Sequence, residues 1–596
     1  MSNFEHSFRN RIGLVASITI LVGASGCEQS LKSKELRIDG LRDSMRTVPS
    51  VNDVAGGVPG DTLEDIEAVT AGEMEPAGLS LERIKKLTSP GAGIELSIEE
   101  ARHAALTNNL GLQGVLLEPE IAEMLVRYEE ARFESTLDLS VGSERTIAPA
   151  YNAFGNENFT VENDTFVATP TLNVPLRTGG AVSLDWTVGS QISNNEIPNF
   201  PSVGLAGSVA SVAIEQPILR GGGIDFNAAP IVIARSNAGE VEARTQYAVI
   251  RTILDTEVAY WNLHRAWSIL EAYKDIYDYT QKVLADARSL NEAGAGSISG
   301  IYTFEVALAK TVSSLIEAEN HLNLVTRELK TLIQDPSLSL ETSVTITPDT
   351  SPVFRMFAFD RPVLVQQALK NRGDLLALEF KEIESAIEVM VAENQLLPRL
   401  DLVGSYSFVG FDSTSSSLRS AQSNMFNEGF GGANPQGWSV GMMASVPLGN
   451  EQAIAMYQAS LMRRLKAIAD TNQREILVSS EVLDAIDSLQ SDWDQILVSR
   501  SRIASARRNL DLMERLYTMG EVTSTDVVVA IRLFADSRVA VADADSNYQI
   551  SLARLSSSIG CVLGFSGIEW ATLRDTNRIK DAQRGLSDDA ADQKMP

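Results

Sequence analysis

Apolar residues alternate with small or polar residues in several segments of the chain, which is the pattern of strands with one apolar and one polar face. The alternation covers residues 165–174, 181–188 and 203–209 in the first half, and residues 400–408 and 438–446 in the second. Sandwich strands show the same period, and so do barrel strands that face lipid on one side and water on the other. The segments are about as long as the 9–11 residues that one membrane crossing needs.

Two very long helices are predicted after these strands, because no proline occurs between Pro230 and Gly294 or between Gly449 and Gly520. A helix of about 70 residues is roughly 105 Å long and must pack along its whole length. Its apolar residues recur at alternating three- and four-residue steps, which indicates coiled-coil packing. They are Leu270, Tyr273, Tyr277, Leu284 and Ala287 in the first stretch, and Val482, Ile486, Leu489, Trp493, Ile496, Ile503, Leu510 and Tyr517 in the second.

Each long helix ends at a turn, over residues 294–299 in the first half and 520–526 in the second. Gly294 and Gly520 can adopt the left-handed conformation that ends a helix. Hydroxyl side chains after each glycine can cap a returning helix, expected over residues 301–334 and 526–560. These candidate caps are Ser297, Ser299, Thr523 and Thr525. Each half is therefore predicted to contain one long helical hairpin.

The two halves form an internal repeat with an offset of 263 residues, from Ala105 to Ala368. Leu137-Asp138-Leu139 of the first half falls on Leu400-Asp401-Leu402 of the second, and the same order of elements follows in both. The predicted segments are a first repeat over 94–335, a connector or equatorial region over 336–361, a second repeat over 362–565, and a polar tail over 566–596.

The charge and the reactive residues exclude several classes of protein. A net charge of −28 and 50 dispersed basic residues argue against a nucleic-acid partner. The two cysteines exclude a disulfide scaffold and a cysteine-based zinc site. The four histidines have no metal-ligand spacing, and no serine elbow or phosphate-binding loop occurs. We therefore expect no metal, no cofactor and no catalysis.

The N-terminus is interpreted as a sorting signal. Arg9 and Arg11 precede an apolar run over residues 12–22, which is too short to span a bilayer but suits a secretory signal. Ala24-Ser25-Gly26-Cys27 resembles a bacterial lipobox, which implies a signal peptide over 1–27 and lipidation of Cys27. Glu28 stands where the inner-membrane retention signal of many lipoproteins has Asp, which favours anchoring in the outer membrane. An ordinary signal peptide cut near Cys27 is the alternative. Residues 28–93 show no sustained period and are predicted to be a periplasmic linker.

The duplicated order of helix, strands, long helix, glycine turn and returning helix resembles the TolC-like outer-membrane factors of efflux and type I secretion. The resemblance rests on residues 96–101 with 105–109, 397–402, 445–449 and 520–527. It implies a mainly α fold with a β-barrel portion. Four transmembrane strands per subunit would close a twelve-stranded barrel in a homotrimer, and antiparallel coiled-coil helices would form a periplasmic tunnel.

The resemblance also implies partners and sites. A periplasmic adaptor protein and an inner-membrane pump would meet the helical tips at Gly294–Ser299 and Gly520–Asp526. Asp526 matches a position of the acidic ring that closes the tunnel, although an Asp in the first turn of a helix is also favoured by the helix dipole alone. Trp186 and Trp438 are candidates for the interface with outer-membrane lipid, or for tryptophans packed under a loop.

Two functional hypotheses remain open at this point. The first is a passive exit duct, gated at the tip and driven by a partner pump. The second is a structural envelope lipoprotein that uses the same coiled coils as a spacer without conducting. A periplasmic enzyme on a coiled-coil frame has little support, and the transported substrate cannot be predicted.

Overall fold

The structure is a computed structural model that describes residues 93–151, 158–195, 203–294, 296–341, 345–357, 359–413, 417–429 and 436–562. All of them belong to the compact unit formed by residues 85–596. The predicted signal peptide with Cys27, nearly all of the predicted linker and the C-terminal tail lie outside the described residues.

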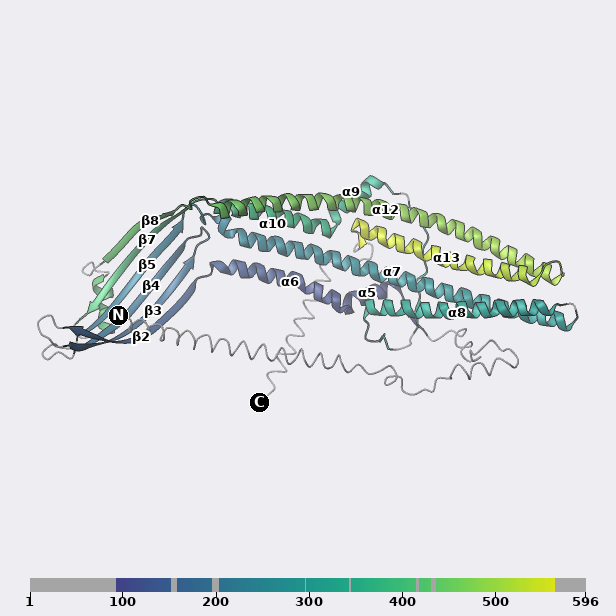
Figure 1. Ribbon diagram of the computed structural model, residues 1–596, viewed down its shortest axis with the longest axis horizontal. Coiled ribbons are helices and arrows are strands. Elements are labelled where there is room, and N and C mark those ends of the chain that lie inside the picture. Colours follow the sequence, from purple (N-terminus) through teal and green to yellow (C-terminus); the bar gives the residue numbers. More distant parts are fainter. Residues whose placement is uncertain are drawn as a thin grey trace, which may run out of the picture. The chain divides into compact units, whose positions relative to one another are not determined.

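The order of helices is the same in both halves of the described chain (Figure 1): a pair of shorter helices, then strands, then one long helix and one returning helix. In the first half these helices are α5 (Ile98–Asn108), α6 (Leu110–Glu130), α7 (Ile224–Glu292) and α8 (Ile298–Ile333). In the second half they are α9 (Arg361–Asn371), α10 (Gly373–Gln395), α12 (Glu451–Thr518) and α13 (Ser524–Ile559).

The long helices pack as hairpins, α7 against α8 and α12 against α13. The positions that the three- and four-residue steps single out are buried at Val482, Ile486, Leu489 and Leu510, as predicted. The helices next to the sheet form one layer in which α6 packs on α7, α7 on α10 and α10 on α12 (Figure 1). Helices α6 and α12 are therefore the two edges of this layer.

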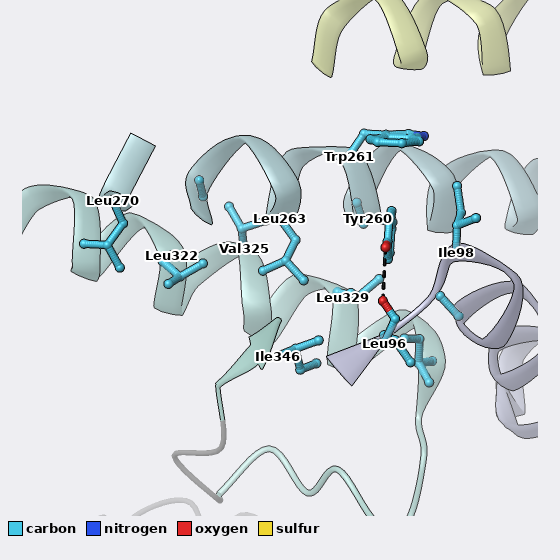
Figure 2. Close-up of a cluster of buried hydrophobic side chains, with 14 of the residues drawn as sticks. Leu96, Ile98, Tyr260, Trp261, Leu263, Leu270, Leu322, Val325, Leu329 and Ile346 are labelled. Atoms are coloured by element: carbon cyan, nitrogen blue, oxygen red, sulfur yellow. Dashed lines mark hydrogen bonds between the residues drawn. The ribbon is translucent and has the colours of Figure 1, made fainter. Parts of the chain in front are cut away.

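A buried cluster near the middle of α7 joins it to α5, α8 and the connector (Figure 2). Strand β1 (Ile94–Leu96) pairs in parallel with β6 (Ile346–Pro348) beside this cluster. The Tyr260 hydroxyl, fully buried on α7, donates a hydrogen bond of 3.0 Å to the Leu96 carbonyl oxygen. The same hydroxyl accepts one from the Thr350 amide at 3.0 Å. A single buried tyrosine thus satisfies backbone groups of both segments, which an apolar residue there would leave unpaired.

The described residues form one six-stranded antiparallel sheet in the order β2-β3-β4-β5-β7-β8. The predicted count of four strands is therefore wrong. The first half contributes four strands and the second half two, because a hairpin of two further strands, β3 and β4, lies between the first and the last strand of the first half. The strands are β2 (Thr136–Tyr151), β3 (Asn158–Pro175), β4 (Ala181–Asn195), β5 (Val203–Pro217), β7 (Arg399–Asp412) and β8 (Gln436–Ser445).

The register places chemically different side chains on the two faces of the sheet. One row of directly paired residues that crosses all six strands is entirely apolar: Leu137, Leu172, Leu184, Val212, Tyr406 and Trp438. The adjacent row, on the opposite face, is polar or small: Asp138, Thr171, Asp185, Ser211, Ser407 and Gly437. Since side chains alternate along each strand, an apolar band on one face lies opposite a polar band on the other at this level of the sheet.

Candidate functional site

The two hairpin turns use glycine for the predicted reason. Gly294 has φ +77° and Gly520 has φ +75°, and neither position is crowded, so backbone conformation rather than space requires glycine there. Ser297 occupies the N-cap of α8, but its side chain makes no capping hydrogen bond. Ser299 lies inside α8, where its carbonyl oxygen accepts a hydrogen bond from a threonine hydroxyl one turn later.

In the second turn Thr523 is the cap, and Thr525 lies in the first turn of α13. The Asp526 carboxylate closes a capping box by accepting hydrogen bonds from the Thr523 hydroxyl at 2.6 Å and from the Thr523 amide at 2.9 Å. These two bonds lower the pKa of Asp526, whose side chain is exposed to solvent. Asp526 is therefore ionised at neutral pH and fixed in orientation at the tip.

The two turns are packed against each other. The rings of Phe304 on α8 and Tyr517 on α12 meet edge to face, with centroids 5.4 Å apart. A Cβ atom at Gly300 would lie 3.3 Å from the Tyr517 hydroxyl oxygen, so the small residue allows this close approach. Below them, a buried cluster takes side chains from all four hairpin helices, including Leu510 and Val527. The tips of the two repeats thus form one packed body.

Polar links continue this contact between the hairpins. The Tyr279 hydroxyl on α7 donates a hydrogen bond of 2.7 Å to the Glu514 carboxylate on α12. Burial raises the pKa of Tyr279, and the bond to Glu514 raises it further, so the hydroxyl keeps its proton. Arg538 on α13 forms an ion pair with Asp275 on α7. None of these links was predicted, because the spacing along one helix does not tell which residue of another helix faces it.

The edges of the sheet and of the helical layer carry exposed apolar residues. Every side chain of residues 136–147 in β2 and 437–445 in β8 is exposed. Helix α6 follows the same edge as β2, and α12 follows the same edge as β8. The exposed apolar residues of the two helices include Leu117, Ile121, Leu125 and Tyr128 on α6, and Met462, Leu465 and Ile476 on α12.

The acidic helix α6 faces one edge of the layer, and a short basic segment of α12 faces the other. Helix α6 holds five glutamates and one arginine, whereas residues 461–466 of α12 hold three basic residues and no acid. Glu118 and Arg464 are both exposed, and each lies about 18 Å along its helix from the end next to the sheet. Opposite charges thus lie at similar depth on the two open edges.

The two candidate interface tryptophans are both on the apolar face but have different surroundings. The Trp186 indole donates a hydrogen bond of 3.0 Å to the Ser208 hydroxyl, and its ring meets Phe426 edge to face at 5.9 Å. Phe426 belongs to a short helical segment formed by α11 (Leu418–Asn424) and residues 425–429, which packs on β4, β5 and β7. Trp438 lies on edge strand β8 and is 76% exposed.

In the described part of the chain, no group of three or more His, Cys, Asp or Glu side chains is placed to hold a metal ion. Within the same residues, no helix combines the length and the apolar character of a transmembrane helix.

The fold of the described residues, a sheet that continues into long helical hairpins with joined tips, is similar to the fold of solved outer-membrane channels. Residues 364–561 match the family described as Outer membrane efflux protein. The chain is 22% identical over 325 residues to Outer membrane protein TolC of Escherichia coli K12, and the aligned region covers 52% of this chain and 61% of TolC. It is 24% identical over 316 residues to the cation efflux system protein CusC of Escherichia coli O157:H7, which covers 52% of this chain and 62% of CusC.

The crystal structure of the Campylobacter jejuni CmeC outer membrane channel matches with a TM-score of 0.57 and 15% identity, over 85% of this chain and 97% of that one. Residues 364–561 are therefore similar to the outer membrane efflux protein family, and the chain is related in sequence to TolC and CusC. It spans about three fifths of the length of these curated relatives. The relatives are outer-membrane and efflux proteins rather than enzymes.

Proposed function

We propose that the protein is the outer-membrane exit channel of a tripartite efflux or type I secretion system. In this proposal residues 94–335 and 362–565 are duplicated repeats, the sheet spans the outer membrane, and the helices form a tunnel in the periplasm. The observation that carries the proposal is the row of directly paired apolar residues that crosses all six strands, with a row of polar or small residues beside it on the opposite face. Lipid would contact the apolar face and a water-filled lumen would contact the polar face.

Closure of the wall requires further copies of the chain. Strands β2 and β8 expose unpaired backbone groups at their outer edges, which a bilayer does not tolerate. Pairing of β8 with β2 of a neighbouring copy would satisfy these groups, bury the apolar residues of α6 and α12, and bring Glu118 near Arg464. The resemblance to the family implies three copies.

The remaining sites follow from this placement. Trp186 and Trp438, on the apolar face, would anchor the sheet at the membrane interface. Cys27, outside the described residues, would carry a lipid anchor in the same membrane, with residues 28–93 as linker. A periplasmic adaptor and its inner-membrane pump would bind the joined tips, where Gly294, Ser297, Ser299, Gly520, Thr523 and Thr525 lie.

Asp526 is the proposed constriction. Three ionised carboxylates at the end of a trimeric tunnel would hold cations and narrow the opening, and contact with the adaptor would separate the tips. The capping box gives Asp526 a structural role as well, so the test must separate charge from helix capping.

The test is conductance of the full-length protein in planar lipid bilayers. We expect low basal conductance that rises in both Asp526→Asn and Asp526→Ala, since both remove the charge and only Asn keeps an oxygen for the Thr523 bonds. A rise in Asp526→Ala alone would assign the effect to a loosened helix start. A folded trimer that never conducts would contradict the channel and favour the envelope spacer.

A further inference from the structure

The hairpin of β3 and β4 is an integral part of the sheet and not an appendage. Strand β3 pairs with β2 over sixteen residue positions, and β4 pairs with β5 over thirteen. Its turn is bound to the base of the neighbouring strand, where the Thr178 hydroxyl donates to the Gln216 side-chain oxygen at 2.7 Å. The Thr178 carbonyl oxygen accepts from the Gly223 amide at 3.1 Å, just before α7 begins.

The two added strands also continue the chemistry of the wall. Leu172 and Leu184 extend the apolar row between Leu137 and Val212, and Thr171 and Asp185 extend the polar row on the other face. A hairpin lying outside a four-stranded wall would have no reason to keep both faces in register with it. The sorted register is expected when lipid contacts one face of β3 and β4 and water contacts the other.

The directions of the strands allow copies with six strands each to join edge to edge. The strands of the sheet run antiparallel to each neighbour, and because their number is even, β2 and β8 run in opposite directions. Placing β8 of one copy beside β2 of the next therefore continues the antiparallel order without interruption.

The width of the helical layer agrees with six strands per copy. Helices pack about 9 Å apart, so the layer of α6, α7, α10 and α12 covers about 36 Å of circumference. Strands are about 4.8 Å apart and, tilted by about 40°, each covers about 6.3 Å of circumference. At this tilt six strands cover about 38 Å and four strands about 25 Å, so the helical layer is wide enough to support all six strands.

We infer that three copies of this chain close an eighteen-stranded barrel. The inference rests on the proposed trimeric channel and departs from the twelve strands that the resemblance implies. Barrel diameter grows about linearly with strand number, so the barrel is about one and a half times as wide as a twelve-stranded one at equal tilt. The barrel is then about as wide as the tunnel, and the helical tip alone sets the size limit for cargo.

The first test counts copies and strands. Full-length protein in detergent is measured by native mass spectrometry and imaged by cryo-electron microscopy along the barrel axis. We expect the mass of three copies and eighteen strands. Three copies with twelve strands, or two copies with twelve strands, would overturn the inference.

The second test asks which side of β4 meets water and does not depend on imaging. In a Cys561→Ser background, cysteines are placed one at a time at Asp185 and at its neighbour Leu184, and a membrane-impermeant maleimide is added to protein in lipid vesicles. The labelling of Cys27 is measured in the background protein and subtracted. We expect Asp185→Cys to react at least about tenfold faster than Leu184→Cys, because one faces the lumen and the other faces lipid. Equal rates at both positions would place the hairpin outside the wall and refute the inference.

The outcomes separate this inference from the proposed function. An eighteen-stranded trimer that does not conduct would contradict the channel and leave the strand count intact. A conducting trimer with twelve strands would contradict only the strand count.

Discussion

Phe304 offers the sharpest test of the idea that the two hairpin tips form one packed body. Its side chain is fully buried in the cluster shared by α7, α8, α12 and α13, and its ring contacts Tyr517. Truncation of a buried phenylalanine to alanine costs about 3–5 kcal/mol, because apolar contacts are lost and a cavity remains. The edge-to-face contact with Tyr517 is lost in the same change.

Phe304→Ala should therefore open the tips locally without unfolding the distant sheet, since stability is not uniform along such long helices. A cost of about 3–5 kcal/mol corresponds to an increase in local opening of about 150-fold to about 4,000-fold. Hydrogen exchange measured by mass spectrometry on peptides from residues 298–310 and 510–530 reports this opening directly. We expect faster exchange on both sides of the contact, in α8 and in the turn after α12.

The matched control is Tyr302→Ala, two residues away on the same helix, where the side chain is 62% exposed. We expect it to change exchange in the tip peptides by less than about fivefold. If Phe304→Ala and Tyr302→Ala gave the same small change, the two tips would not be held together by this cluster, and the argument would fail.

Two further changes test the packing of α11 on the sheet and the ion pairs of Asp374 at the start of α10. Gly410→Ala places a Cβ atom 2.5 Å from backbone atoms of the α11 segment and should displace α11, so that trypsin cuts at Arg419. Gly207→Ala, where the nearest atom is 3.6 Å away, should leave Arg419 protected, and equal cleavage in both would refute the packing. Burial raises the pKa of Asp374, but the Arg372 guanidinium and a second arginine lower it more, so the net pKa lies below 3.8. The ionised Asp374 carboxylate stabilises the folded protein above the pKa that Asp374 has in the unfolded chain. This stabilisation is lost as the pH falls through the pKa of Asp374 in the folded protein. Asp374→Asn should therefore cost about 3 kcal/mol at pH 7, seen as earlier thermal loss of helical circular dichroism, and the difference should shrink below pH 3.8.

The helical hairpins could be predicted in detail because their signals are local. The spacing of Val482, Ile486 and Leu489 identifies the buried side of α12 without knowledge of its partner, and Gly520 marks its end. Among the four candidate caps only Thr523 makes the complete capping box. The spacing did not separate Thr523 from Ser297, because capping depends on the side-chain rotamer as well as on residue type.

The strand count was missed because it was taken from the family resemblance rather than from this chain. Alignment of Leu137-Asp138-Leu139 with Leu400-Asp401-Leu402 already places a strand start at residue 137, since the second segment begins β7. The adjacent charges of Glu144 and Arg145 hide the rest of β2. In the structure Arg145 forms an ion pair with Glu162 on β3. A periodicity counted along one strand cannot predict which residues of another strand will pair with it.

The packing of α11 on the sheet could not be predicted either. It depends on the small residues Ser208 and Gly410, which are far apart in sequence. They become neighbours and leave room for α11 only when β5 and β7 pair.

The parallel pairing of β1 with β6 constrains the order in which the chain can fold. Contacts beside Tyr260 join Ile98 to Thr350, 252 residues later, so this pairing cannot form until α8 and the connector have been synthesised. Until then α5 can pack only on α7, and the four strands of the first repeat have open edges. Such long sequence separation slows folding and prolongs the exposure of aggregation-prone edges. We expect the nascent first repeat to depend on holding chaperones until the second repeat arrives.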